Sequence, residues 1–261
     1  MSDNYLNDYY ESYNEDERLR SRWGQVEFLT TMKYISQYLE NGMRVLDIGA
    51  GTGRYSRAIA EKEFHVDAVE LIEHNIKIFK DKNEDLKNIS VKQGNALDLS
   101  FIDDNAYDMT LLMGPMYHLY TKEDKLKALS EAIRVTKPKG FILISYCVPD
   151  NSIIEYGFKE GNILTLIERN MLDTDTFKTF SAPRDLFEMA RKKDIDELMS
   201  GFDTERLHYV ATDGFSRLIK ETLGTMDDEI FDIYLKYHFT ICENEDMVGV
   251  THHSLDVVRK L

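Results

Sequence analysis

Apolar residues recur along the chain in two alternating periods. From Leu19 to Leu39 they are spaced by threes and fours and are followed by Asn41-Gly42, which predicts an amphipathic helix that ends at the glycine. Beyond it, short apolar runs alternate with helical patterns, which predicts strands at 43–48, 64–70, 89–94, 107–113 and 141–148 and helices at 54–63, 73–87 and from Thr121 onward. Strands joined by crossover helices pair in parallel. The pattern therefore predicts an α/β fold with a doubly wound sheet.

The rhythm changes after Val148. Residues 150–205 are mixed helical and polar, and they form a connection far longer than the usual few residues between elements. An amphipathic stretch runs from Asp227 to Phe239, and residues 254–259 alternate like a last strand. We expect residues 150–205 to be an inserted helical lid over a substrate, with a structural or dimerising appendage as the alternative.

Composition narrows the class of protein. The chain has 261 residues with 32 Lys+Arg and 47 Asp+Glu, a net charge of −15, which argues against sequence-independent binding of nucleic acid. Two distant cysteines, Cys147 and Cys242, supply neither a disulfide framework nor a cysteine-based zinc site. The first residues lack a signal-peptide pattern, and the longest apolar run, 141–148, is too short for a membrane helix. We expect a cytoplasmic globular protein with no membrane or nucleic-acid partner.

A glycine-rich turn carries the sharpest chemical signal. Three glycines follow the strand at 43–48 in the order G-x-G-x-G: Gly49, Gly51 and Gly53. Glycines at a strand-to-helix turn let a ligand approach the backbone closely. A dinucleotide fingerprint would be G-x-G-x-x-G, but Arg54 stands where its last glycine would be. Asp47 precedes the turn, and Glu70 ends the second strand, where a carboxylate can accept hydrogen bonds from ribose hydroxyls.

Together, Asp47-Ile-Gly-Ala-Gly-Thr-Gly53 and Glu70 resemble the cofactor site of class I S-adenosylmethionine-dependent methyltransferases. Gln93-Gly-Asn-Ala-Leu-Asp98 resembles the adenine-contacting segment of that family, although the family often has Asp where Asn95 stands. The segments Tyr107–Leu119 and Lys137-Pro-Lys-Gly140 resemble its fourth strand with the following loop and its usual turn before strand five. The resemblance covers residues 43–148.

The resemblance implies a Rossmann-like, mostly parallel seven-stranded sheet, S-adenosyl-L-methionine as cofactor and a helical insertion after strand five. It implies an N-terminal helical cap at 1–42, a cofactor-binding domain formed by 43–149 and 206–261, and the inserted lid at 150–205. The implied cofactor contacts are Asp47, Gly49, Ala50, Gly51, Gly53, Glu70, Leu71, Asn95, Ala96 and Met113.

Methyl transfer needs an aligned nucleophile with an unprotonated lone pair. Tyr117 and His118 follow strand four and are the candidate catalytic residues, although a packed or cofactor-shielding role explains His118 equally well. No metal site is expected. Asp150-Asn151 comes too late in the strand to match the metal-dependent catechol-type enzymes, and the adjacent His252 and His253 would point to opposite faces of a strand.

The substrate class is inferred from the same loop. Met113-Gly-Pro-Met-Tyr117 does not reproduce the Asp/Asn-Pro-Pro-Tyr/Phe motif of nucleic-acid amino-methyltransferases, which favours a small-molecule acceptor. Tyr5, Tyr9, Tyr10 and Tyr13 suggest an aromatic flap, and with the acidity they point to an amine among the candidates, although packing or fraying at the terminus explains the tyrosines equally well. Methyl transfer to protein or RNA, and a non-catalytic cofactor-binding module, remain alternatives. The sequence leaves the acceptor atom and the oligomeric state open.

Overall fold

The computed structural model of the chain describes residues 2–12, 15–247 and 249–261. Within them the chain forms a seven-stranded sheet in the order β3-β2-β1-β4-β5-β7-β6. Its first five strands are β1 (Arg44–Ile48), β2 (His65–Glu70), β3 (Ile89–Gln93), β4 (Tyr107–Leu112) and β5 (Thr136–Cys147). These pair in parallel, while β7 (His253–Lys260) is antiparallel to both β5 and β6 (Thr204–Ala211). The predicted mostly parallel, doubly wound sheet is confirmed.

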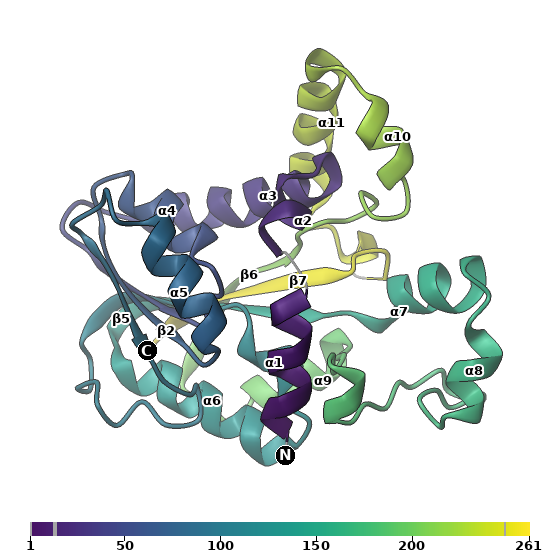
Figure 1. Cartoon of the computed structure of the whole chain (residues 1–261), viewed down its shortest axis with the longest axis horizontal. Coiled ribbons are helices and arrows are strands. Elements are labelled where there is room, and N and C mark those ends of the chain that lie inside the picture. Colours follow the sequence, from purple (N-terminus) through teal and green to yellow (C-terminus); the bar gives the residue numbers. More distant parts are fainter. Residues whose placement is uncertain (1, 13–14, 248) are drawn as a thin grey trace.

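Helices cover both faces of the sheet (Figure 1). On one face α3 (Arg22–Tyr38) and α4 (Arg54–Ala60) pack through a core that includes Ile35, Ile59 and Val45. On the other face α6 (Lys122–Val135) and α9 (Lys192–Met199) pack through a core that includes Leu46 and Leu129. Because Val45 and Leu46 are successive residues of β1, their side chains point to opposite faces and serve one core each.

The predicted start of the fifth strand is too late. β5 begins at Thr136, which pairs with Tyr107, and the next paired residue is Phe141, opposite Met109. Three more residues lie between the two pairs on β5 than on β4, so the segment 137–140 bulges out of the ladder. Because the residues of this bulge are typical of a turn, the sequence does not reveal that the strand already begins before it.

Long connections flank β6. Between β5 and β6 the chain forms α7 (Pro149–Ser152), η2 (Ile153–Lys159, a π-helix), α8 (Ile163–Glu168), η3 (Pro183–Asp185) and α9. Between β6 and β7 it forms α10 (Lys220–Thr225), α11 (Asp228–Ile241) and η4 (Glu245–Met247). Leu223 and Phe231 of this second connection pack against Val26 of α3 rather than against the sheet. The role of residues 150–205 as a lid stays a prediction.

The N-terminal helices approach the carboxyl ends of the parallel strands. α1 (Ser2–Ser12) contacts α5 (Glu73–Lys82) and η3, and it lies between α5 and the segment that carries α7 to α9 (Figure 1). α2 (Glu15–Arg20) packs on α3. In parallel α/β sheets, ligands bind outside the carboxyl ends of the strands. Among the described ranges, no helix combines the length and apolarity needed to cross a membrane.

The start of α6 gives a local test of the fold. Thr121 is its N-cap, and its hydroxyl accepts a hydrogen bond of 3.1 Å from the Asp124 N–H. We expect Thr121→Ala to lower the free energy of unfolding by about 1 kcal/mol, because that N–H loses its partner. Urea denaturation measures the change. Thr121→Ser keeps the hydroxyl and serves as the control, and equal loss in both variants would contradict the capping role.

Candidate active site

The glycine-rich turn follows β1 and leads into α4. Gly49, Gly51 and Gly53 have φ of +73°, +55° and +84°, values that side-chain-bearing residues rarely adopt. A Cβ on Gly49 would lie 2.6 Å from Pro115, and one on Gly53 would lie 2.5 Å from the Phe79 ring. A Cβ on Gly51 would meet no atom within 4 Å. The outer glycines are therefore required by packing, whereas Gly51 borders open space.

Two buried carboxylates lie behind this turn. The Ser56 hydroxyl donates a 2.6 Å hydrogen bond to Asp47, and burial together with the nearby Glu70 charge raises the pKa of Asp47 to about 6. The Glu70 carboxylate accepts hydrogen bonds from the N–H groups of Gly51 (2.8 Å) and Ile72 (2.9 Å), and burial raises its pKa. The hydrogen bond to Gly51 ties the end of β2 directly to the turn.

The predicted adenine segment follows β3. The Asn95 side chain is exposed, and its amide oxygen accepts a hydrogen bond from the Leu97 N–H at 2.9 Å within its own loop. Ala96 is buried in the core, and Leu71 is half-buried after β2. These three residues, like Gly53 and Glu70, are not among those that line the main cavity. Their contact with a cofactor stays a prediction.

A cavity of about 760 Å³ opens beside the turn. Several of the predicted cofactor contacts come together in its lining: Asp47, Gly49, Ala50, Gly51 and Met113. Tyr117 also lines it, from the loop after β4, and Tyr9 and Tyr10 line it from α1. Tyr5 is exposed, and Tyr13 lies outside the described residues. The turn, the loop after β4 and the N-terminal helix therefore share one cavity.

His118 ends η1 (Pro115–His118) and is tied on both sides of its ring. Its Nδ1 lies 2.8 Å from the Leu186 carbonyl oxygen and its Nε2 lies 2.9 Å from the Tyr10 hydroxyl. A neutral ring that donates from Nδ1 and accepts at Nε2 satisfies both contacts. Burial lowers the pKa of His118 to about 4. Through these two contacts His118 ties α1 to the β5–β6 connection, which fits the packed role that the sequence left open, and its catalytic role stays a prediction.

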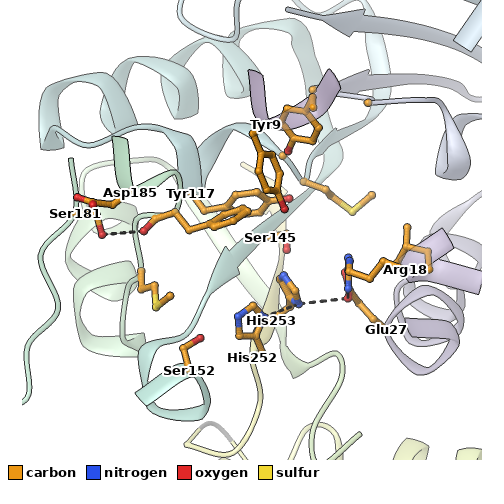
Figure 2. A pocket seen from close by; sticks show the side chains of 18 of the residues that line it. Tyr9, Arg18, Glu27, Tyr117, Ser145, Ser152, Ser181, Asp185, His252 and His253 are labelled. Atoms are coloured by element: carbon orange, nitrogen blue, oxygen red, sulfur yellow. Dashed lines mark hydrogen bonds and ion pairs between the residues drawn. The ribbon is translucent and has the colours of Figure 1, made fainter. Parts of the chain in front are cut away.

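The opposite wall of the cavity carries a buried network of charges (Figure 2). The Arg18 guanidinium donates two hydrogen bonds to Glu27, at 2.5 and 3.1 Å. The Nδ1 atom of His253 lies 3.3 Å from Glu27 and 3.2 Å from Asp213. Burial raises the pKa of Glu27, but the charges of Arg18 and His253 outweigh it and hold that pKa well below its usual value.

Comparisons with known proteins agree with this architecture. Residues 45–140 match the family model described as a methyltransferase domain. The demethylmenaquinone methyltransferase of Staphylococcus epidermidis is 31% identical over 108 residues, which are 40% of this chain and 43% of the relative. The ubiquinone/menaquinone biosynthesis C-methyltransferase of Idiomarina loihiensis is 33% identical over 136 residues, 48% of this chain and 52% of the relative. The chain thus spans about half the length of these curated relatives.

A solved S-adenosylmethionine-dependent methyltransferase from Methanosarcina mazei aligns over 87% of this chain and 97% of its own, with a TM-score of 0.58 and 14% identity. The two proteins therefore share their fold over almost the whole of both chains. Residues 45–140 thus match a methyltransferase domain, and the chain shares the fold of an S-adenosylmethionine-dependent methyltransferase. The strand order of the sheet is that of the Rossmann-like methyltransferase fold.

The methyltransferase domain presents groups that fit S-adenosylmethionine. Open space lies next to Gly51, where a cofactor would meet the backbone. Each Glu70 oxygen accepts a backbone N–H and keeps further acceptor capacity for ribose hydroxyls. Arg54 lines the cavity, and its buried Nε has no hydrogen-bond partner among the described residues. This donor fits the carboxylate of the cofactor, and the sequence pattern gave no signal for such a role of Arg54.

Asp47 of the candidate site links the stability of the fold to pH. Its folded-state pKa of about 6 lies above the ordinary 3.8, so this carboxyl stabilises the fold only when protonated and costs stability as the pH rises through 6. We expect Asp47→Asn to raise the free energy of unfolding at pH 8 by about 2 kcal/mol and to weaken cofactor binding. Urea titrations at pH 8 and pH 5 measure it. An advantage that persists undiminished at pH 5 would contradict the electrostatic cause.

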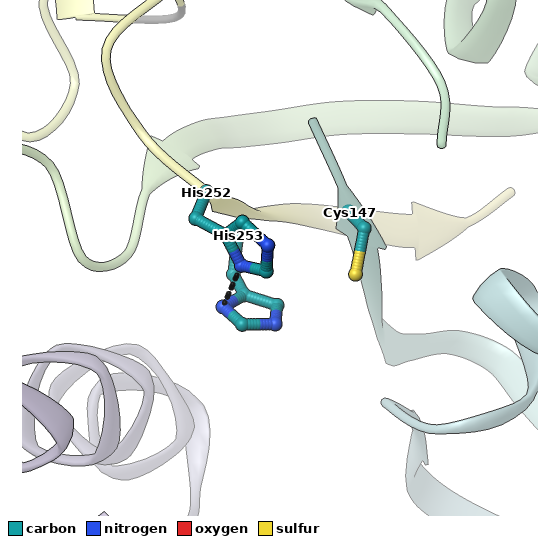
Figure 3. A group of neighbouring side chains, drawn as sticks. All are labelled: Cys147, His252 and His253. Carbon is teal, nitrogen blue, oxygen red and sulfur yellow. Dashed lines mark hydrogen bonds between the residues drawn. The ribbon is translucent and has the colours of Figure 1, made fainter. Parts of the chain in front are cut away.

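The expectation that His252 and His253 point apart is wrong. His252 precedes β7 instead of lying within it, so strand alternation does not separate the two rings. Both line the cavity, with their Nδ1 atoms 3.2 Å apart (Figure 3). Together with Cys147 they bring three ligand-type atoms within 4.8 Å of one another, and Glu27, Asp213 and His253 form a second such group. The sequence pointed to His252 and His253 but not to Glu27 and Asp213, the partners of His253. A charged residue on the apolar side of a helix, as Glu27 is, was the available signal.

Proposed function

We propose that the chain is a methyltransferase that transfers the methyl group of S-adenosylmethionine to a small-molecule acceptor. The observation that carries this proposal is the cavity itself, which runs from the glycine turn to the His252–His253 wall with a volume of about 760 Å³. That volume falls in the range of about 300–1,000 Å³ that is typical of small-molecule sites, and here it has to hold both cofactor and acceptor. A compact acceptor fits this space better than a polymer.

The residues of the chain act by binding, alignment and exclusion of water. Bound S-adenosylmethionine would supply an electrophilic methyl group on a sulfonium. Glu70, Arg54 and the glycine turn would hold its ribose and methionine parts. We expect Tyr117, which lines the cavity together with Met113, to contact the acceptor, and Tyr9 and Tyr10 to shield the cavity from the side of α1. Such shielding would favour attack by an aligned acceptor lone pair over side reactions with water.

The quinone substrates in the names of the curated relatives are not evidence for the substrate of this chain. Those matches cover 40–48% of it, and the model match ends at residue 140, before the connections that line the acceptor side of the cavity. The acceptor is therefore a matter for experiment.

The experiment is incubation of the protein with S-adenosylmethionine labelled in its methyl group and with fractionated cell metabolites. Label in an identified small molecule supports the proposal. Label found solely in protein or RNA would favour a macromolecular acceptor. Binding of the cofactor without transfer to any fraction would favour a non-catalytic module, and absence of binding would reject the proposal.

A further inference from the structure

The charge of the cavity lining is opposite in sign to that of the chain. The chain carries −15, whereas the residues that line the cavity include six Lys/Arg and four Asp/Glu. One of those acids, Asp185, is shared by two of the cations, Arg169 at 2.6 Å and Arg184 at 3.7 Å. A single carboxylate balances one of these two charges, so a positive charge remains at this side of the cavity.

Arg217 repeats this arrangement elsewhere in the cavity lining. The buried Glu155 carboxylate pairs with both Arg217 (2.6 Å) and Lys220 (2.8 Å). Arg217 uses its Nε for that bond, and its two terminal amino groups have no hydrogen-bond partner among the described residues. Since Arg217 lines the cavity, these donors are available to a ligand.

The two histidines add donors to the same wall. The Nδ1 of His253 faces the Glu27 and Asp213 carboxylates, so this atom carries a proton. The Nδ1 of His252, 3.2 Å away, then accepts from it, and the proton of His252 resides on Nε2. Burial, followed by the charges of His253, Arg217 and Arg18, lowers the pKa of His252 well below its usual value, so it stays neutral.

The carboxylates of this wall are already engaged. Glu27 accepts two hydrogen bonds from Arg18 and faces His253. Asp213 accepts from the Thr251 hydroxyl and from His253. An ammonium group would have to displace these partners, whereas an anion would meet donors that lack partners. The wall is thus suited to a negative ligand.

We propose that the methyl acceptor carries an oxyanion group, a carboxylate or a phosphate, that binds against Arg217 and His252. This inference rests on the proposed function and names the class of its acceptor. A sulfonium cofactor adds positive charge to the same cavity, which favours an anionic acceptor further. An amine, the candidate that the sequence suggested, would instead meet repulsion from the surplus cations.

The test uses three probes with one aromatic ring and different head groups: phenylacetate, phenyl phosphate and phenethylamine. Each is titrated by calorimetry into the full chain saturated with S-adenosylhomocysteine. We expect at least one anionic probe to bind about tenfold more tightly than the amine, and we expect Arg217→Gln to lose about tenfold of that affinity. Which anion binds more tightly distinguishes a carboxylate from a phosphate acceptor.

Two further variants guard against indirect effects. Arg217→Lys keeps the charge beside Glu155 and is expected to retain more anion affinity than Arg217→Gln. Arg259→Gln removes an exposed arginine that pairs with Glu205 outside the cavity lining and is expected to change nothing. Equal or tighter binding of the amine, or no saturable binding of either anion, would overturn the inference. Failure to bind S-adenosylhomocysteine at all would instead overturn the proposed function.

Discussion

Replacement of Glu70 by glutamine is expected to weaken S-adenosylmethionine binding about 100-fold, because hydrogen bonds to a charged group contribute about 1.5–3 kcal/mol each. In the folded chain the two Glu70 oxygens accept the N–H groups of Gly51 and Ile72. A glutamine side chain has one oxygen, so whichever way it is turned its NH₂ group faces one of these donors. The substitution is thus expected to disturb the turn as well as the proposed ribose contact.

Calorimetric titration with S-adenosylmethionine measures this loss. Glu73→Gln is the matched control, since Glu73 is an exposed acid at the start of α5 and is absent from the cavity lining. The control variant is expected to bind like the wild type. Unchanged affinity in Glu70→Gln would show that the end of β2 does not hold the ribose.

The sequence predicted the sheet well because its signals are local. Apolar runs bounded by turn residues place β1 to β4 within about two residues of their observed limits. The start of β5 escaped because Pro138 and Gly140 read as a turn, although the strand resumes after the bulge. The packing of Leu223 and Phe231 on α3 also escaped, since residues so distant in sequence leave no periodic trace of their contact.

The same difference between local signals and distant contacts decides which parts of the site could be predicted. The glycine turn with Asp47 and Glu70 is a short motif whose spacing fixes its place at the strand ends, so its position could be predicted. The charged wall could not, because Glu27, Asp213 and His253 come from three distant segments that meet only after the sheet has formed. The roles of His118 and Tyr10 were hidden in the same way, since their hydrogen bond joins residues 108 positions apart.

Glu27 is the position where a single substitution is expected to cost most stability. Glu27→Gln removes the charge that Arg18 and His253 share in a buried setting, and breaking such a pair costs about 3–5 kcal/mol. The pKa of Glu27 is lowered by folding, so its contribution is present above about pH 4.5 and is lost as the pH falls through the folded-state value. Burial lowers the pKa of His253, but the Glu27 charge opposes this effect and the pKa is raised well above its usual value. The contribution of His253 to stability is therefore present below about pH 6.5 and is lost as the pH rises through the folded-state pKa.

Urea denaturation at pH 5.5 and at pH 8.5 measures both effects. The wild type is expected to lose part of the contribution of His253 at the higher pH, and Glu27→Gln is expected to show a smaller difference between the two conditions. Glu205→Gln, which removes an exposed acid paired with Arg259, is expected to change stability by less than about 0.5 kcal/mol. If Glu27→Gln were no more destabilising than this control, the network would contribute little to stability. Removal of one partner of a buried ion pair is expected to destabilise the protein strongly, whereas removal of one partner of an exposed pair is not.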